Sequence, residues 1–294
     1  MKIAFLFAGQ YRPIPKDLIR FSIQKLTKGI DYDIFCYSWD EMGESQDHRE
    51  EIPKIKSDNG SYKQISSIFS EFNLKEIYTE SYDNFVINLP KKHKRIFNSK
   101  IYHKGTIFAL PQIYTLSKCY KLLDNDKDKY DLIFRCRFDS IYLHPLNIYP
   151  LRKFLNSSTL YNINFGRAYY PNRIYDIFFG GSNKSMSFLD KIWGEIPQLV
   201  KNNLNNGQDK RDACRLFYVA AVTNKVEIKS FKTINVSIVA ESVQKIKPMS
   251  DYTSSFPTFL PPRKSTLNSV SIDASLGNAA NLGSAIGVCK AIKP

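Results

Sequence analysis

The chain opens on the apolar run Ile3-Ala4-Phe5-Leu6-Phe7-Ala8, which Gly9 closes. An uninterrupted apolar run of this length is typical of a strand that is covered on both faces. Apolar residues then recur at helical spacing over 17–26, and a second apolar run over 32–39 ends at Asp40. Residues 1–40 therefore predict a βαβ unit, whose two strands should be parallel.

The rest of the chain continues this alternation of helices and strands. Helical periodicity marks the segments 62–72, 107–123, 188–204 and 209–221. Strands are expected at 76–79, 130–138, 159–163, 174–179, 226–231 and 234–239. The polar segment 41–60 is expected to form a loop or lid, and 91–104 a basic connection. The pattern predicts an α/β fold with a mostly parallel central sheet and helices on its flanks.

Length and composition favour one large domain. The chain has 294 residues, of which 43% are hydrophobic and 14% aromatic, which suffices for a packed core. From Leu260 onward there is no Phe, Tyr or Trp. We therefore expect a catalytic domain over 1–240 and a C-terminal extension over 241–294 that is loosely packed or partly disordered.

The net charge of +14 favours anionic partners such as nucleotide phosphates, nucleic acid or an anionic membrane. A lysine-rich solvated surface is the alternative explanation. The densest cluster is Lys91-Lys92-His93-Lys94-Arg95, and a single cluster of this kind is little support for nucleic acid. No stretch approaches the roughly 18 apolar residues that a membrane span needs, so any membrane contact should be peripheral.

Cysteine and histidine usage argues against a disulfide framework or a zinc site. The five cysteines are an odd number and contain no CxxC pair. This usage is typical of reduced cysteines in a cytoplasmic protein. The four histidines are scattered, and His144 is either a further metal ligand near Asp139 or an ordinary surface histidine.

Charged residues alternate at the end of one predicted strand, in the stretch Tyr130-Asp131-Leu132-Ile133-Phe134-Arg135-Cys136-Arg137-Phe138-Asp139. Residues two apart share a strand face, so Arg135, Arg137 and Asp139 are expected to point the same way. Ligands of open α/β sheets bind beyond the carboxyl ends of the strands. The arginines could meet phosphate oxygens and Asp139 a divalent metal; alternatively, the three form an internal salt bridge that only organises the sheet.

Two glycine-containing turns are further candidates. The loop Gly9-Gln10-Tyr11-Arg12 follows the first strand, where Gly9 would let the backbone approach a ligand and Arg12 could meet a diphosphate. An ordinary strand-to-helix turn explains this loop equally well. Gly180 and Gly181 either give a ligand close access or simply start a helix, with Ser182 as its N-cap.

Three aspartates are candidates for a catalytic base. Asp209 and Asp212 lie near the start of a predicted helix, where the helix dipole favours acids in any protein. Asp176, in the strand expected over 174–179, is the third. A carboxylate can act as the base that takes the proton of a hydroxyl.

These segments resemble, in order, motifs of GT-A-like glycosyltransferases from bacterial and viral polysaccharide gene sets. Residues 130–139 resemble the family stretch in which a single aspartate replaces the metal-binding DxD motif. Residues 1–12 resemble its opening strand and loop, 33–40 its second strand, 112–118 a helix, and 176–182 a later strand and turn. The resemblance covers about residues 1–225. It departs from DxD in having Ser140 after Asp139 instead of a second acid, which leaves a metal requirement open.

The resemblance implies a GT-A-like fold and transfer of a sugar from a nucleotide-sugar donor to a glycan or lipid-linked acceptor. It implies that Mn²⁺ or Mg²⁺, if used, binds Asp139. In GT-A enzymes the base of an inverting transfer is a carboxylate late in the domain, so the resemblance makes Asp212 the first choice for that role, with Asp209 and Asp176 as rivals. The donor-binding residues would be Ala8, Gly9, Gln10, Arg12, Gln112, Arg135, Arg137, Asp139, Gly180 and Gly181. The expected location is the cytoplasm, with peripheral contact to the inner membrane face.

Two other functions stay open. A nucleotidyl- or phosphotransferase would share the phosphate site but need more acids around a metal. A non-enzymatic nucleic-acid-binding protein would need a continuous basic face with exposed aromatic side chains. Most aromatic residues of this chain lie inside apolar runs instead, which disfavours nucleic acid as a partner.

Overall fold

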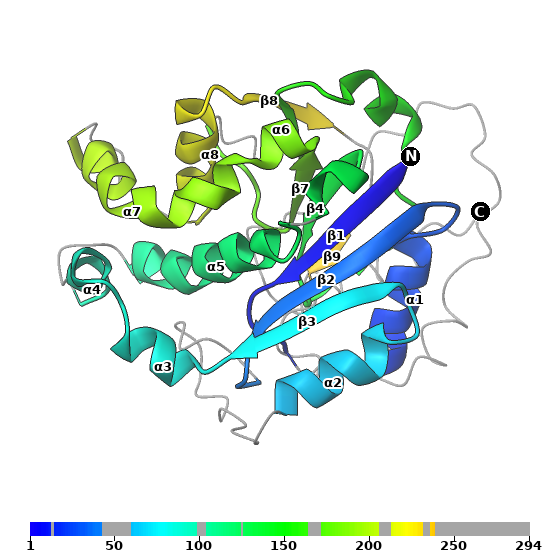
Figure 1. Ribbon diagram of the computed structural model, residues 1–294, viewed down its shortest axis with the longest axis horizontal. Helices are drawn as coiled ribbons and strands as arrows, with labels where there is room; N and C mark the ends of the chain where they lie inside the picture. The colour runs from blue at the N-terminus through cyan, green and yellow to red at the C-terminus, as the bar shows by residue number, and fades with distance from the viewer. Residues whose placement is uncertain are drawn as a thin grey trace, which may run out of the picture.

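The computed structural model describes residues 1–12, 15–42, 60–98, 104–124, 126–163, 172–205, 213–231 and 236–238. Its centre is a seven-stranded sheet in the order β3-β2-β1-β4-β7-β6-β8 (Figure 1). The strands are β1 (Lys2–Ala8), β2 (Asp31–Trp39), β3 (Leu74–Glu80), β4 (Leu132–Cys136), β6 (Thr159–Ile163), β7 (Phe178–Gly181) and β8 (Glu227–Phe231). The extension predicted over 241–294 lies outside the described residues.

The sheet is mostly parallel, as the sequence predicts. Strand β1 pairs in parallel with β2 on one side and with β4 on the other, and β3 extends the parallel group at β2. Only β7 runs against its neighbours β4 and β6 among the described strands of this sheet. Strands β5 (Ser140–Tyr142) and β9 (Val236–Ile238) form a separate antiparallel pair. This arrangement confirms the predicted α/β fold with a mostly parallel central sheet.

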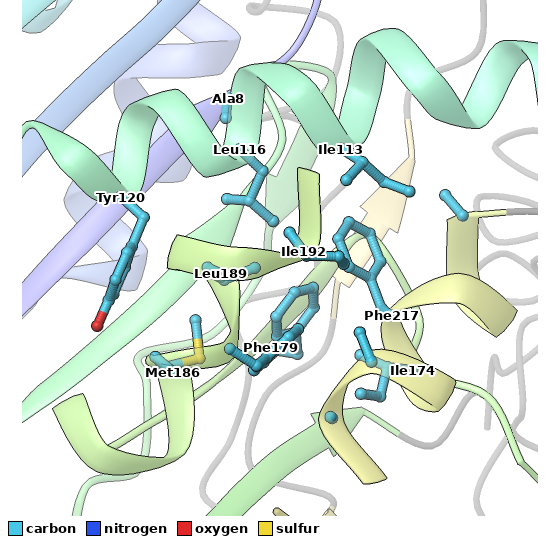
Figure 2. Close-up of a cluster of buried hydrophobic side chains, with 14 of the residues drawn as sticks. Ala8, Ile113, Leu116, Tyr120, Ile174, Phe179, Met186, Leu189, Ile192 and Phe217 are labelled. Atoms are coloured by element: carbon cyan, nitrogen blue, oxygen red, sulfur yellow. The ribbon is translucent and has the colours of Figure 1, made fainter. Parts of the chain in front are cut away.

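Helices cover both faces of the sheet. Helices α1 (Lys16–Leu26) and α2 (Gly60–Phe69) bury their apolar sides on one face. Helices α5 (Lys104–Lys121), α7 (Phe188–Asn205) and α8 (Ala213–Thr223) cover the other. Figure 2 shows Ile113 and Leu116 close to Ile192 and Phe217, so three helices share one core. The smaller helices are α3 (Tyr82–Ile87), α4 (Lys91–Phe97), α6 (Asn183–Met186), η1 (Lys127–Lys129) and η2 (Tyr149–Phe154).

Several predicted boundaries need correction. The basic connection expected over 91–104 is wrong for 91–97, which form helix α4, and α3 precedes it without having been predicted. The strand expected over 174–179 starts four residues later, at Phe178. Ile174 and Ile177 are buried, so they have the apolar character of a strand, but they lie in the segment before it. Most of the predicted lid over 41–60 lies outside the described residues. Pro111 lies inside helix α5.

The parallel pairing brings two carboxyl ends together. Phe7, near the end of β1, pairs with Cys136 at the end of β4. The loops that follow both strands therefore leave the sheet at the same edge, which is where open α/β sheets place their ligands. Within the described ranges no helix combines the length and apolar character that crossing a bilayer demands.

Candidate functional site

The loop after β1 is fixed against the neighbouring strand. Gly9 has a φ of +119°, a backbone conformation that residues with a side chain rarely adopt. Its N–H donates to the Tyr37 carbonyl oxygen at 3.1 Å, and the Tyr11 N–H donates to Ser38 Oγ at 3.2 Å. These bonds direct Arg12 toward the end of β4.

Asp139 is the centre of an ion-pair network at this edge. Arg12 Nη1 donates to its Oδ2 at 2.6 Å. Arg137 binds both carboxylate oxygens, through Nε to Oδ1 at 2.7 Å and through Nη2 to Oδ2 at 2.6 Å. Asp139 is 3% exposed, so this buried carboxylate has its negative charge matched by two guanidinium groups.

A second carboxylate extends the network to another part of the chain. Asp176, just before β7, accepts a hydrogen bond from Arg137 Nη1 at 2.9 Å. Gln112 of α5 donates to the same carboxylate, and Cys214 Sγ of α8 lies 3.5 Å from Asp176 Oδ1. Arg137 thus joins two aspartates and lies between elements that are far apart in the sequence.

Arg135 does not point the same way as Arg137 and Asp139. The strand ends at Cys136, so the predicted alternation over 135–139 stops there, and Asp139 lies in a turn. Arg135 is 1% exposed and donates from Nη1 to the Ala8 carbonyl at 2.9 Å and to that of Cys136. Its Nε has no hydrogen-bond partner among the described residues. This arginine ties the ends of β1 and β4 together.

The network holds a surplus of positive charge. Three guanidinium groups, of Arg12, Arg135 and Arg137, face two carboxylates, of Asp139 and Asp176. Burial opposes ionisation of Asp139, but Arg137 and Arg12 outweigh it and hold the pKa of this carboxyl below its usual range. The pKa of Asp176 is lowered too, because Arg137 and Arg135 likewise outweigh burial. Both acids are therefore ionised at neutral pH.

The residues at Asp139 do not fit a divalent metal in this arrangement. Three guanidinium N–H groups occupy three of about four acceptor positions of the carboxylate. A dication at the remaining position would lie beside two positive charges. Among the described residues there is no group of three His, Cys, Asp or Glu side chains that could hold a metal. The donor set at this edge suits an anion better than a cation.

Gly180 and Gly181 lie away from the network. They pair with Phe134 and Ile133 inside β4, on the amino side of Arg135. A Cβ at Gly180 would lie 2.3 Å from the Ile133 carbonyl oxygen, and one at Gly181 would lie 2.7 Å from that of Thr159. Close strand packing explains both glycines without a ligand. The predicted N-cap is confirmed, since Ser182 Oγ accepts a hydrogen bond from the Ser185 N–H.

The other predicted residues have varied positions. The base candidates Asp209 and Asp212 lie outside the described residues. The Ala8 carbonyl is used by Arg135, and Gln10 Oε1 is buried without a partner among the described residues. His144 is exposed. Cys36, Cys119, Cys136 and Cys214 form no disulfide bond among the described residues.

The sequence did not reveal one member of the network, and the start of the quoted motif lies outside the network. Cys214 carries no motif, and only the folded chain brings it to Asp176. Tyr130 and Asp131, part of the quoted motif, lie at the opposite edge of the sheet. There Tyr130 Oη donates to Asp33 at 2.9 Å, and the Lys2 N–H donates to Asp131 at 2.7 Å.

Comparison with known proteins adds little to this geometry. No family model matches the chain, and no curated protein matches its sequence. Among the solved structures that are similar is mouse xyloside xylosyltransferase 1 in its apo form, at 10% identity and a TM-score of 0.42. The match covers 79% of this chain and 85% of that one. The class of this protein, a mostly parallel α/β sheet with an arginine-rich carboxyl edge, rests on its own topology and contacts.

Proposed function

We propose that the chain is a nucleotide-sugar-dependent glycosyltransferase that binds the donor diphosphate at Arg12 and Arg137. The observation that supports this is the surplus positive charge at the carboxyl edge of β1 and β4, beside the loop of Gly9. Ligands of open α/β sheets bind at this edge, and guanidinium groups bind phosphate oxygens in pairs.

The two outer arginines have the exposure that this role requires. The side chains of Arg12 and Arg137 are 22% and 19% exposed, so both are anchored at Asp139 and still reach the surface. Arg135 is fully buried and acts on a ligand only through its charge and through the Ala8 carbonyl. Fixed cations of this kind stabilise the negative charge that develops on a departing diphosphate.

In the proposed reaction these arginines do the work that a metal does in many sugar transferases. The metal predicted at Asp139 would compete with Arg12 and Arg137 for the same carboxylate oxygens. We therefore assign Asp139 the role of orienting the two arginines. The Mn²⁺ arm of the experiment below tests this assignment separately from nucleotide binding.

The base of an inverting transfer is proposed to be Asp212, with Asp209 as the alternative. Either carboxylate would take the proton of the acceptor hydroxyl. The hydroxyl oxygen then bonds to the anomeric carbon of the donor sugar while the bond from that carbon to the diphosphate breaks. Asp176 is the poorer candidate, because Arg137 and Gln112 bind its carboxylate and its pKa is lowered. Asp212→Asn should lower kcat far more than Asp209→Asn, with nucleotide affinity unchanged in both.

The proposed acceptor is a glycan or a lipid-linked sugar in the cytoplasm, at the inner membrane face. The net charge of +14 supports an anionic acceptor or surface. Transfer to such an acceptor releases a nucleoside diphosphate. Release of pyrophosphate from a nucleoside triphosphate instead would identify a nucleotidyltransferase. Transfer of a phosphoryl group rather than a sugar to the acceptor would identify a phosphotransferase.

Thermal unfolding with a ligand panel tests the donor site. The panel is UDP, GDP, CMP and their sugars, each with and without Mn²⁺, against wild type and Arg12→Ala. Arg20→Ala is the matched control, since Arg20 pairs with Asp17 and Glu71 away from the site. A ligand that binds only the folded chain raises the melting temperature, by an amount set by its affinity.

We expect one nucleotide to stabilise wild type and the control, and to stabilise Arg12→Ala much less. Equal shifts with and without Mn²⁺ support transfer without a metal at Asp139. A shift that requires Mn²⁺ rejects the metal-free assignment and keeps the transferase. Shifts with tRNA or DNA alone, and none with any nucleotide, would replace the transferase by a nucleic-acid-binding protein.

A further inference from the structure

The segment between Asp83 and Asp124 contains no Asp or Glu, although it carries many cations. Helix α4 lies within it and has the sequence Lys91-Lys92-His93-Lys94-Arg95-Ile96-Phe97. A segment without acids cannot neutralise its own lysines and arginines. Any compensating charge must come from elsewhere in the fold or from a partner.

Helix α4 has a buried side that fixes it to the body of the protein. The His93 ring stacks on Trp193 of α7 with 4.2 Å between ring centroids, and His93 Nε2 lies 2.7 Å from the Trp193 carbonyl oxygen. Ile96 packs into the core that α5 and α7 share. Burial lowers the pKa of His93, so this residue is neutral at pH 7 and adds no charge.

The other side of α4 is a row of exposed cations. Lys91, Lys92, Lys94 and Arg95 are all exposed, and none forms an ion pair with any residue that the structure describes. Elsewhere in the described chain, Arg12, Arg20, Lys127 and Arg137 pair with carboxylates. The four α4 cations and Ile87, defined here as the α4 face, thus form a cationic surface without compensating acids among the described residues.

Ile87 adds an exposed apolar group a few residues before these cations in the chain. It is the last residue of α3 and is 66% exposed. Among the described residues, the other exposed large aliphatic side chain is Val222, at 48%. Only three residues, Asn88 to Pro90, separate it from α4. The exposed tyrosines Tyr62, Tyr78 and Tyr149 belong to other elements, so the α4 face lacks the aromatic platforms that single-stranded nucleic acid needs.

The position of this face relates it to the candidate site. Strand β3 ends at Glu80 and leads directly into α3 and then α4 (Figure 1). Helix α4 packs on α5, whose Gln112 reaches Asp176 in the network. The α4 face is therefore joined to the edge of the sheet where the parallel strands end.

We propose that the α4 face docks on the anionic lipid headgroups of a membrane. Clusters of four or more cations on an amphipathic helix attract acidic lipids, each cation strengthening binding by roughly fivefold near the surface. The isoleucine would enter the headgroup region, where apolar side chains are favoured. This docking does not depend on the proposed transfer reaction; it names the surface through which the chain meets the membrane.

Vesicle co-sedimentation of the full-length protein tests the proposal. The vesicles are phosphatidylcholine alone and phosphatidylcholine with phosphatidylglycerol. The test variant replaces the four α4 cations by alanine: Lys91→Ala, Lys92→Ala, Lys94→Ala and Arg95→Ala. The matched control removes the same charge from exposed positions on other elements: Lys28→Ala, Lys63→Ala, Lys184→Ala and Arg152→Ala. A second variant, Ile87→Ser, leaves all charges in place.

We expect wild type and the control to bind acidic vesicles, with binding that weakens as salt is added. The α4 variant should lose on the order of a hundredfold or more in partitioning. Ile87→Ser should lose severalfold, and this loss should persist at high salt. Thermal unfolding confirms that each variant is folded, since all these side chains are exposed. Equal losses in the α4 variant and the control, or binding to RNA or an anionic polysaccharide but not to vesicles, would overturn the proposal.

Discussion

The two edges of the central sheet differ in the cations that pair with their aspartates. At the amino edge, Asp33 accepts bonds from Tyr130 Oη and from Lys2 Nζ at 2.8 Å. Asp131 holds the Lys2 N–H there, with a side chain that is 45% exposed. These contacts join β1, β2 and β4 at their starts, and the cations there are amino groups rather than guanidinium groups.

At the carboxyl edge the same strands end among three arginines, the buried Asp139 and the partly buried Asp176. The motif that resembles sugar transferases is therefore divided between the edges: its Tyr-Asp start supports the fold, and its Arg-Asp end forms the candidate site. The difference teaches that a motif's residues can serve separate purposes at opposite ends of one strand. The following predictions test that separation.

Asp139→Asn should have the largest effect on stability. The substitution leaves two partly buried guanidinium groups without their shared carboxylate, which should lower the free energy of unfolding by about 3–5 kcal/mol. Urea denaturation measures the loss. Asp131→Asn at the exposed amino edge is the control and should cost at most about 1 kcal/mol. Similar losses in the two variants would contradict the contrast between the edges.

Gly180→Ala should cost about 3 kcal/mol, at the upper end of overpacking effects, because the new Cβ would lie 2.3 Å from the Ile133 carbonyl oxygen. Nucleotide affinity below the melting temperature should stay unchanged. Gly9→Ala differs in its cause: a Cβ added at Gly9 would meet nothing within 4 Å, but the φ of +119° would strain the alanine backbone. Calorimetric titration should then show weaker nucleotide binding for Gly9→Ala alone. A loss of affinity in Gly180→Ala would link that glycine to the donor site.

The free energy of unfolding should depend on pH in the acid range because of Asp139 and Asp176 at the carboxyl edge. The pKa values of Asp139 and Asp176 are lowered below the ordinary 3.8 by their arginine partners. A carboxylate with a lowered folded pKa adds stability that is complete above the unfolded pKa and is lost as pH falls toward the folded pKa. Below about pH 4, the free energy of unfolding should fall by up to about 1.4 kcal/mol per pH unit for each carboxylate. Denaturation at several pH values should show a shallower slope in Asp139→Asn.

Tyr130→Phe should have the smallest effect. It removes one buried hydrogen bond, to Asp33, and should lower the free energy of unfolding by about 1 kcal/mol. Because Tyr130 lies at the amino edge, nucleotide-induced shifts in melting temperature should match those of wild type. A reduced shift would show that the two edges are coupled.

The long apolar strands were the most predictable part of the fold. Strands β1 and β2 are buried over most of their length, so their sequences are mostly apolar. Helix α4 was missed because only two of its residues, His93 and Ile96, are buried, too few to produce a helical pattern. Strand β7 was misplaced because its last two residues are glycines, which the close approach of β4 and β6 requires.

The site was predictable where it is local and unpredictable where it depends on the fold. Arg137 and Asp139 pair as neighbours in sequence, although a turn rather than a shared strand face brings them together. The separate position of Arg135 could not be predicted, because it depends on where β4 ends and on a carbonyl of β1. The bond between Arg137 and Asp176 joins residues from different elements, and Gln112 and Cys214 join them from two helices. No sequence spacing carries that information.

The attachment of the loop after β1 has a consequence for the thermodynamics of recognition. Gly9 and Tyr11 are each bonded to β2, and Arg12 is bonded to Asp139, so the loop is already ordered before a ligand arrives. A preorganised loop spares the ligand the entropy cost of ordering it. Association should therefore be quick and accompanied by little backbone rearrangement, and the slow event should be the exchange of Arg12 between its aspartate and the incoming anion.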